Sequence, residues 1–210
     1  RIFVLILRRK RRRDMKIESY KYPESSFLSI EKDMGILVDL ILKNENLKKL
    51  LYYTTKDCLK KPKLTEDESL GLFNKNIKLV PKLEVDEEVL NYLFISFDNF
   101  SENDSNPEFR NNLIEFDILC HFDQWQMNDF KLRPYRIAAE IDSMLRKKRL
   151  TGIGEIQFLG ASQIIINDEF GGLCLLYQAV HGGEDKKRAP NPNDESNLIN
   201  NFNAIFNDEK

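Results

Sequence analysis

The stretch Glu108–Trp125 constrains the fold more than any other part of the chain, because apolar and polar residues alternate along most of it. The apolar positions are Ile114, Phe116, Ile118, Cys120 and Phe122. The positions between and after them are Glu115, Asp117, Leu119, His121 and Asp123, in which Leu119 is the one apolar exception. Successive side chains of a β-strand point to opposite faces, so this pattern predicts a long, half-buried strand.

A second strand is predicted just before this one. Residues 89–97 are almost continuously apolar or aromatic, which indicates a central strand covered on both faces. A polar loop over residues 101–108 is expected to join it to the strand over residues 109–123. The two strands together predict a hairpin with a long loop.

A helix and two more strands are predicted downstream. Pro134 suits the first turn of a helix, where a missing N–H costs nothing. Strands are expected over residues 155–166 and 172–181, joined near residues 167–172. The pair Gly160 and Ala161 indicates a bulge or bend in the first of these strands.

The N-terminal third of the chain has a different character. Apolar residues recur at helical spacing over residues 29–43, with Ser29 as the expected N-cap, and a shorter helical segment follows around residues 47–51. Residues 56–88 are charged and interrupted by Pro and Gly, which predicts an irregular connector with one short strand at residues 77–80.

These elements predict the α+β class. The expected core is a small antiparallel or mixed sheet with one packed helix, in the order β-β-α-β-β, over residues 89–182. Residues 15–88 form the N-terminal helical region and connector, and residues 183–210 form an extended C-terminal arm. Residues 1–14 are expected to be a non-native or disordered basic extension, because Met15 begins a stretch typical of a natural start.

Charge is distributed unevenly along the chain. Residues 1–14 hold seven Lys or Arg residues and one acid, which leaves 25 basic and 33 acidic residues, a net charge of −8, for residues 15–210. An acidic body of this kind argues against avid binding of duplex nucleic acid through bulk charge. The short apolar run Ile2–Leu7 is far below the length that spans a bilayer, and it precedes the basic residues, the reverse of a signal peptide.

The sequence contains no convincing catalytic, cofactor or metal site. Its three cysteines are scattered without a CxxC pair, and His121 and His181 are its only histidines. Cys120 and His121 are adjacent, but neighbours on a strand point to opposite faces, so they are poorly placed to act as nucleophile and base. We therefore expect no enzyme activity, no cofactor and no metal.

Four blocks of the sequence carry a resemblance to a known family. They are Leu93–Phe100, Ile114–Trp125, Arg133–Asp142, and Leu150–Phe158 with its continuation into residues 167–172 and 176–178. In these blocks, and in the order of strands and helix, the chain resembles the tail terminator (tail completion) proteins of the head–tail neck of tailed bacteriophages. The basic start and the residues after 182 fall outside the resemblance.

The resemblance implies a structural virion protein that forms a ring, commonly of six subunits. Such a ring ends the growing tail tube and joins it to the head connector. The implied partners are other copies of the chain, the tail tube protein and a head-completion or connector protein, with genomic DNA passing through the lumen without specific binding. It implies assembly in the host cytoplasm, a final place in the virion and no membrane contact.

A closed ring needs two different contact patches on each subunit. Candidate interface residues on the hairpin are Phe97, Phe100 and Phe109. The second patch is expected from the loop before Trp125 or from the turn over residues 167–172, with Trp125 and Phe170 as its candidate residues. Candidate DNA-facing or lumen-facing residues are Arg146, Lys147, Lys148 and Arg149.

Two alternative functions stay open at this stage. A nucleic-acid-associated factor, regulatory or involved in packaging, would use the basic clusters Arg8–Arg13 and Arg146–Arg149. A hydrolase using Cys120 and His121 would lose its activity when Cys120 is replaced, whereas we expect a buried, inert thiol.

Overall fold

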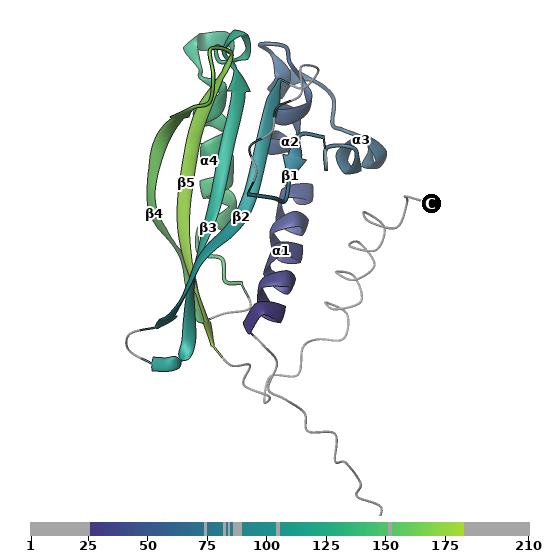
Figure 1. Ribbon diagram of the computed structural model, residues 1–210. Helices are drawn as coiled ribbons and strands as arrows, with labels where there is room; N and C mark the ends of the chain where they lie inside the picture. The colour runs from purple at the N-terminus through teal and green to yellow at the C-terminus, as the bar shows by residue number, and fades with distance from the viewer. Residues whose placement is uncertain are drawn as a thin grey trace, which may run out of the picture.

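The computed structural model describes residues 26–182, apart from residues 74, 82, 84, 86–89, 104–105 and 151–152. Its centre is a five-stranded sheet in the order β1-β2-β3-β5-β4 (Figure 1). The strands are β1 (Ile77–Lys78), β2 (Asn91–Asn103), β3 (Asn106–His121), β4 (Ile153–Ile165) and β5 (Phe170–Gly182). Strand β1 pairs parallel to β2, and all other pairs are antiparallel.

Helices cover one face of this sheet. They are α1 (Ser26–Lys43), α2 (Glu45–Tyr52) and α4 (Arg133–Leu145), whereas the short α3 (Glu66–Leu70) lies to the side (Figure 1). Short 3-10 turns occur at η1 (Cys58–Lys60), η2 (Phe122–Gln124) and η3 (Asn128–Phe130). The predicted α+β class and the β-β-α-β-β order are confirmed.

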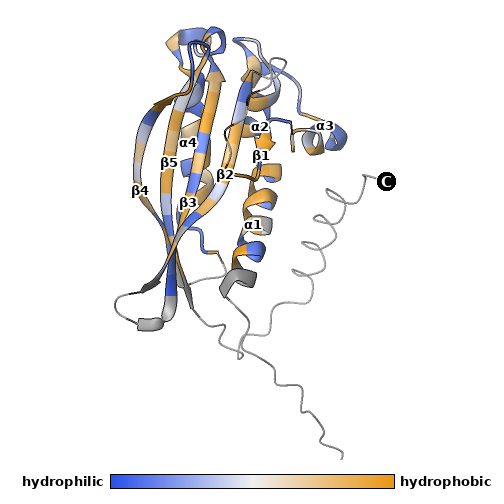
Figure 2. Cartoon of the chain, viewed as in Figure 1, coloured by the Kyte–Doolittle hydropathy of each residue, from blue (hydrophilic) through white to orange (hydrophobic). Residues whose placement is uncertain are grey.

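The alternating stretch builds the main core from its apolar face. Ile114, Phe116, Ile118 and Cys120 have no exposed surface and pack with the helices, and Figure 2 shows the matching concentration of hydrophobic residues on the strands and on α1. Phe122 departs from the prediction. The strand ends at His121, the chain turns into η2, and Phe122 is 38% exposed.

The opposite face of the sheet has a small core of its own, which explains the exception at Leu119. Tyr92, Phe94, Leu119 and Phe170 are each at most 3% exposed, and Val85 from the connector packs against them. Strand β2 is therefore buried on both faces over its first half, as its continuous apolar run predicts.

Several element boundaries differ from the predictions. Helix α1 begins at Ser26, so Ser29 lies within the helix and is not its N-cap. The predicted loop over residues 101–108 is wrong, because the polar residues after Phe100 continue the ladder, with Ser101 opposite Asn111 and Glu102 opposite Arg110. The hydrogen bonds of this ladder join backbone N–H and C=O groups, so they form whether or not the side chains are buried.

Other predictions hold in outline. The connector forms the short strand β1, but it also contains η1 and α3, which the charged sequence did not suggest; Thr65 caps α3 through a reciprocal bond with Glu68. Pro134 lies in the first turn of α4, and the pairing of β4 with β5 shifts between Phe158 and Gly160, the predicted bulge. The interpretations of residues 1–14 and 183–210 lie outside the described residues.

One buried arginine joins the helical layer to the loop after β3. Arg133 has no exposed surface, and its guanidinium donates five hydrogen bonds of 2.7–3.3 Å to backbone carbonyls. The acceptors are the carbonyls of Leu50, Tyr53, Thr54, Thr55 and Gln124. Three of these acceptors follow α2 directly and Leu50 lies in its last turn, where carbonyls lack helical partners and the helix dipole favours a cation.

Replacing this arginine by lysine is expected to destabilise the fold. Lysine keeps the charge but cannot reach five carbonyls with a planar fork, so several buried acceptors lose their donors. We expect Arg133→Lys to lower the free energy of unfolding in urea by about 2–4 kcal/mol. The matched control is Arg136→Lys on the outer side of α4, where Arg136 forms a 3.1 Å ion pair with Glu140 and the expected loss is below about 1 kcal/mol. Equal losses would contradict this role.

Gly172 marks a second point where the fold tolerates little change. A Cβ atom at this position of β5 would lie 1.7 Å from the backbone oxygen of Ile118, whereas one at Gly160 would meet nothing within 4 Å. We expect Gly172→Ala to shift the backbone pairing of β3 with β5 and to cost at least about 3 kcal/mol. Gly160→Ala is the matched control and should change the unfolding midpoint little; the opposite ranking would show that the close approach is not needed.

Candidate functional site

Strand β4 forms one edge of the sheet and leaves an open groove beside α4. The groove has a volume of about 790 Å³. Its floor comes from Leu173, Leu175 and Tyr177 of β5, and its walls come from α4 and β4. An edge strand presents unpaired backbone groups, which native proteins protect or use for contact with another chain. We call this feature the α4–β4 groove.

A second apolar surface lies at the end of the sheet where β3 ends and β5 begins. Two segments meet there: the Phe122 N–H donates a 2.8 Å hydrogen bond to the Glu169 carbonyl, and the Phe122 ring lies against Gly171. The exposed apolar residues of these two segments are Phe122, Phe130, Leu132, Ile165 and Ile166, and we call them together the end patch. Figure 1 shows this end of the sheet opposite the end where β2 finishes and β3 begins.

Phe130 is the most exposed large apolar residue of the described part of the chain. Its side chain is 90% exposed, and its backbone lies in the left-handed region with a φ of 58°. Asp129 before it also has a φ of 60°. Such backbone geometry costs about 1–3 kcal/mol for each non-glycine residue, and it concentrates at functional positions. The backbone of Asp129 and Phe130 is therefore strained, and the Phe130 ring that it carries is exposed to solvent.

The predicted interface residues fall in different environments. Phe100 on β2 is 40% exposed. Phe97 and Trp125 are partly buried against the main core, and the Trp125 indole N–H donates to the Cys120 carbonyl at 3.1 Å. Phe170 is 3% exposed and lies in the second core. Phe109 lies on β3 opposite Gly182, and its side chain is outside the described part.

The second patch was predicted either near Trp125 or at residues 167–172, and the structure brings these two segments together in the end patch. Phe130 itself was missed. The signal available in the sequence was the pair Asn128 and Asp129 before it, because these residue types are enriched in left-handed turn positions.

The predicted basic cluster lies at the C-terminal end of α4. Arg146, Lys147, Lys148 and Arg149 are all exposed, and Arg146 forms a 3.0 Å ion pair with Asp142 one helical turn back. Arg146 and Lys147 also line the α4–β4 groove. A DNA-facing role for these residues stays a prediction.

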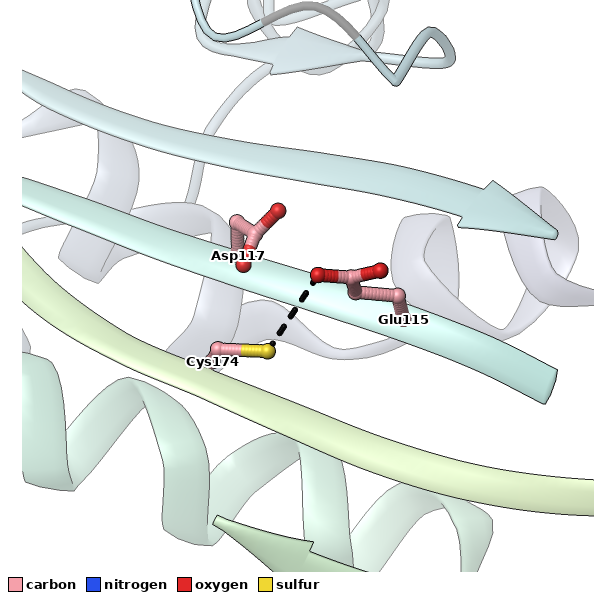
Figure 3. Close-up of side chains that lie close together, drawn as sticks. All are labelled: Glu115, Asp117 and Cys174. Carbon is pink, nitrogen blue, oxygen red and sulfur yellow. Dashed lines mark hydrogen bonds between the residues drawn. The ribbon is translucent and has the colours of Figure 1, made fainter. Parts of the chain in front are cut away.

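The polar face of β3 contains a small cluster of titratable groups. Glu115 and Asp117 come from β3 and Cys174 from β5, directly opposite Asp117 in the strand pairing (Figure 3). Asp117 and Cys174 are each 8% exposed, and the Cys174 thiol donates to Glu115 Oε1 at 3.3 Å. We call these three residues the acid–thiol cluster.

Burial dominates the electrostatics of the acid–thiol cluster. It raises the pKa of Asp117 to about 6, with a further contribution from the charge of Glu115 and a smaller opposing one from Cys174. Burial and the nearby carboxylates also raise the pKa of Cys174. The ligand atoms of the three residues lie within 4.8 Å of one another, so they could hold a metal ion. An ion would have to displace the thiol proton that now bonds Glu115, and the raised pKa of Cys174 keeps this thiol protonated.

The other cysteine that was considered for catalysis is buried in the main core. Cys120 has no exposed surface, and burial raises the pKa of its thiol to about 12. His121 lies on the other face, with its ring edge-on to Phe170. The two side chains therefore do not meet, as the strand alternation predicts.

No helix in the described part of the chain is long and apolar enough to cross a membrane.

The comparisons with known proteins place the chain in a class of phage-derived proteins. A scan against protein-family models matches residues 44–179, which is more than half of the chain. The chain therefore belongs to the YomW family. A search of curated proteins found no significant match. The phage derivation of the family agrees with the broader part of the resemblance, whereas the tail terminator role stays a prediction.

The acid–thiol cluster predicts an unusual pH dependence of stability. The pKa of Asp117 is about 6 in the folded protein and about 3.9 in an unfolded chain, so the folded state binds the proton more tightly. Stability should therefore fall as pH rises from about 4 to about 6, by up to about 3 kcal/mol from this group. Asp117→Asn should remove this loss, so the variant gains stability over the wild type between pH 4 and pH 7 in urea unfolding.

Asp168→Asn is the matched control, because Asp168 is an exposed acid in the turn between β4 and β5. It should follow the wild-type pH profile. If Asp117→Asn follows the same profile as well, Asp117 does not titrate as its burial predicts.

Proposed function

We propose that this YomW-family protein is a structural virion protein of the phage head–tail neck. In this proposal it forms a ring that ends the tail tube and joins it to the head connector, and it acts through assembly without catalysis. The phage-derived family supports the proposal, as do the four resembling sequence blocks and the β-β-α-β-β order.

The observation that carries the self-assembly part is Phe130 on the end patch. An aromatic ring that is 90% exposed on a strained backbone contributes nothing to packing within its own subunit. Aromatic side chains that fill a partner's pocket are typical centres of protein interfaces. Burial of this ring by a neighbouring subunit would stabilise the contact by removing apolar area from water, and the entropic cost of ordering a flexible loop would be avoided.

Ring formation also needs a second, different patch, because a head-to-tail contact joins unlike surfaces. The β2–β3 hairpin turns at the far end of the sheet from the end patch (Figure 1). Phe100, 40% exposed on that hairpin, is the best placed of the predicted interface residues to contribute. We propose that the hairpin end of one subunit contacts the end patch of the next.

The remaining partners follow from this role. The tail tube protein and the head-completion or connector protein would bind the two faces of the ring, and DNA would pass through the lumen without specific binding. An acidic body weakens binding to phosphates, which suits such passage. Assembly would take place in the host cytoplasm, with the finished ring in the virion.

Native mass spectrometry and negative-stain microscopy of the full chain test this proposal, alone and with tail tube protein. We expect rings of uniform size that cap tube ends. Phe130→Ser should reduce ring formation at least tenfold while leaving the urea midpoint of the monomer nearly unchanged, because the lost side chain is exposed.

Val80→Ser is the matched control, since Val80 is an exposed apolar residue that follows β1, at the other edge of the sheet from β4. It should leave ring formation intact. A wild-type chain that stays monomeric and ignores tube ends would contradict the proposal. Strong DNA binding that weakens steeply with salt would instead favour the nucleic-acid alternative.

A further inference from the structure

Helix α4 has a buried apolar stripe and a second, mixed face that lines the α4–β4 groove. Its buried stripe consists of Pro134, Ile137, Ile141, Met144 and Leu145. The face that lines the α4–β4 groove consists of Tyr135, Ala138, Ala139, Asp142 and Arg146; its apolar members are Tyr135 and the two alanines, of which Ala138 also packs against the main core. The two alanines are small enough to let another helix approach α4 closely.

The opposite wall of the groove, formed by β4, offers further apolar surface. Phe158 of β4 is 54% exposed, and its ring packs edge-on against Tyr177 on the groove floor. Ala161, one register step beyond the bulge, is also exposed on this wall. Both walls therefore offer apolar side chains to the apolar face of a short helix, and the Gln163 side chain joins the walls at one point by donating to the Tyr135 hydroxyl at 3.0 Å.

The chain itself carries a segment with the complementary pattern. Apolar residues in the C-terminal sequence occur at Leu198, Ile199, Phe202, Ile205 and Phe206. This i, i+1, i+4, i+7, i+8 spacing predicts an amphipathic helix, with asparagines on its other side. As a helix, residues 197–206 would be about 15 Å long, which fits beside the roughly 20 Å of α4.

Charges at the ends of this segment complement the groove. Asp194 and Glu195 precede the apolar residues, and Asp208 and Glu209 follow them. Arg146 and Lys147 line the groove at the C-terminal end of α4. Asp142 and Glu155 also line the groove, and Arg146 is ion-paired with Asp142, so the exposed Lys147 is the cation that a pair of acids would approach on docking in either direction.

The path of the chain favours its own groove over that of another copy. Val180 near the end of β5 pairs with Ile153 at the start of β4, and the Ile156 N–H bonds to the Lys148 carbonyl. The chain thus leaves the sheet at the basic end of the groove. Leu198 follows Gly182 by 16 residues, which span up to about 50 Å when extended. A tether of this length gives residues 197–206 an effective concentration in the millimolar range at the groove of their own chain.

We propose that residues 197–206 dock as an amphipathic helix into the α4–β4 groove of the same subunit. Docking covers Phe158, Tyr135 and the inner flank of the edge strand β4. It does not depend on ring formation, so the two proposals can fail separately.

Disulfide trapping in the full chain tests this docking. The chain with Ala139→Cys and Phe202→Cys should form the new disulfide at least tenfold faster under mild oxidation than the matched chain with Ala139→Cys and Asn200→Cys. Position 200 lies on the opposite side of the predicted helix from the apolar stripe. The three native cysteines are buried, so they interfere little.

Isotope labels separate docking within one chain from exchange between copies. Chains labelled with ¹⁴N and ¹⁵N are refolded together before oxidation, and the cross-linked peptides are identified by mass spectrometry. Peptides of uniform label support the proposal. Mixed-label peptides would show that the groove takes a neighbour's segment, and equal rates for the two cysteine pairs would show no docking; either result overturns the proposal.

Methyl NMR supplies a second readout that needs no added cysteine. Phe202→Asp should shift the methyl resonances of Ala138, Ala139 and Ala161, whereas Asn200→Asp should leave them in place. Unchanged resonances in both variants would overturn the proposal even if the cross-link fails for geometric reasons.

Discussion

The Arg133 guanidinium is the contact on which the arrangement of layers depends. It binds carbonyls from α2, from the segment after α2 and from the turn after β3, groups that lie far apart in the sequence. A buried charge is costly unless all its donors are used, and here they are used on carbonyls that would otherwise lack partners at a helix end. These hydrogen bonds therefore satisfy the donors of the guanidinium together with carbonyl acceptors at the end of α2 and in the turn after β3. Without Arg133, these carbonyls would lack their donors.

The loop that presents Phe130 is built from this anchor. The backbone N–H of Arg133 donates to the Trp125 carbonyl at 2.7 Å, and that of Met127 donates to the Lys131 carbonyl. The backbone N–H of Asn128 donates to the Lys56 carbonyl. These bonds fix both sides of the loop, so the left-handed residues between them cannot relax without breaking the contacts around them. Strain at Asp129 and Phe130 is thus maintained by the stability of the core, which holds the exposed Phe130 ring in one place.

The parts of the fold that the sequence predicted correctly are those with a local signal. Alternation places Ile114 and Phe116 in the core, and Pro134 marks the start of α4, because each depends on neighbouring residues alone. The role of Arg133 has no such signal, since its acceptors meet only after packing. The same holds for Cys174 beside Asp117, which requires the register of β3 with β5. The polar end of the β2–β3 hairpin was missed because backbone pairing there does not depend on burial.

The edge strand β4 is the part of the sheet that the docking proposal concerns. Its bulge near Gly160 twists the edge, a common protection against unwanted pairing, but Phe158 and Leu159 beside it stay half exposed. A tethered segment in the α4–β4 groove would cover one flank of this strand in the free subunit. If a neighbouring subunit also binds that flank, the apparent affinity between the two subunits equals the intrinsic affinity multiplied by the fraction of subunits whose groove is open. Residues 197–206 would have to be displaced before that flank could bind. Displacement is easier on an existing assembly, because several contacts form there together, than when two free subunits pair.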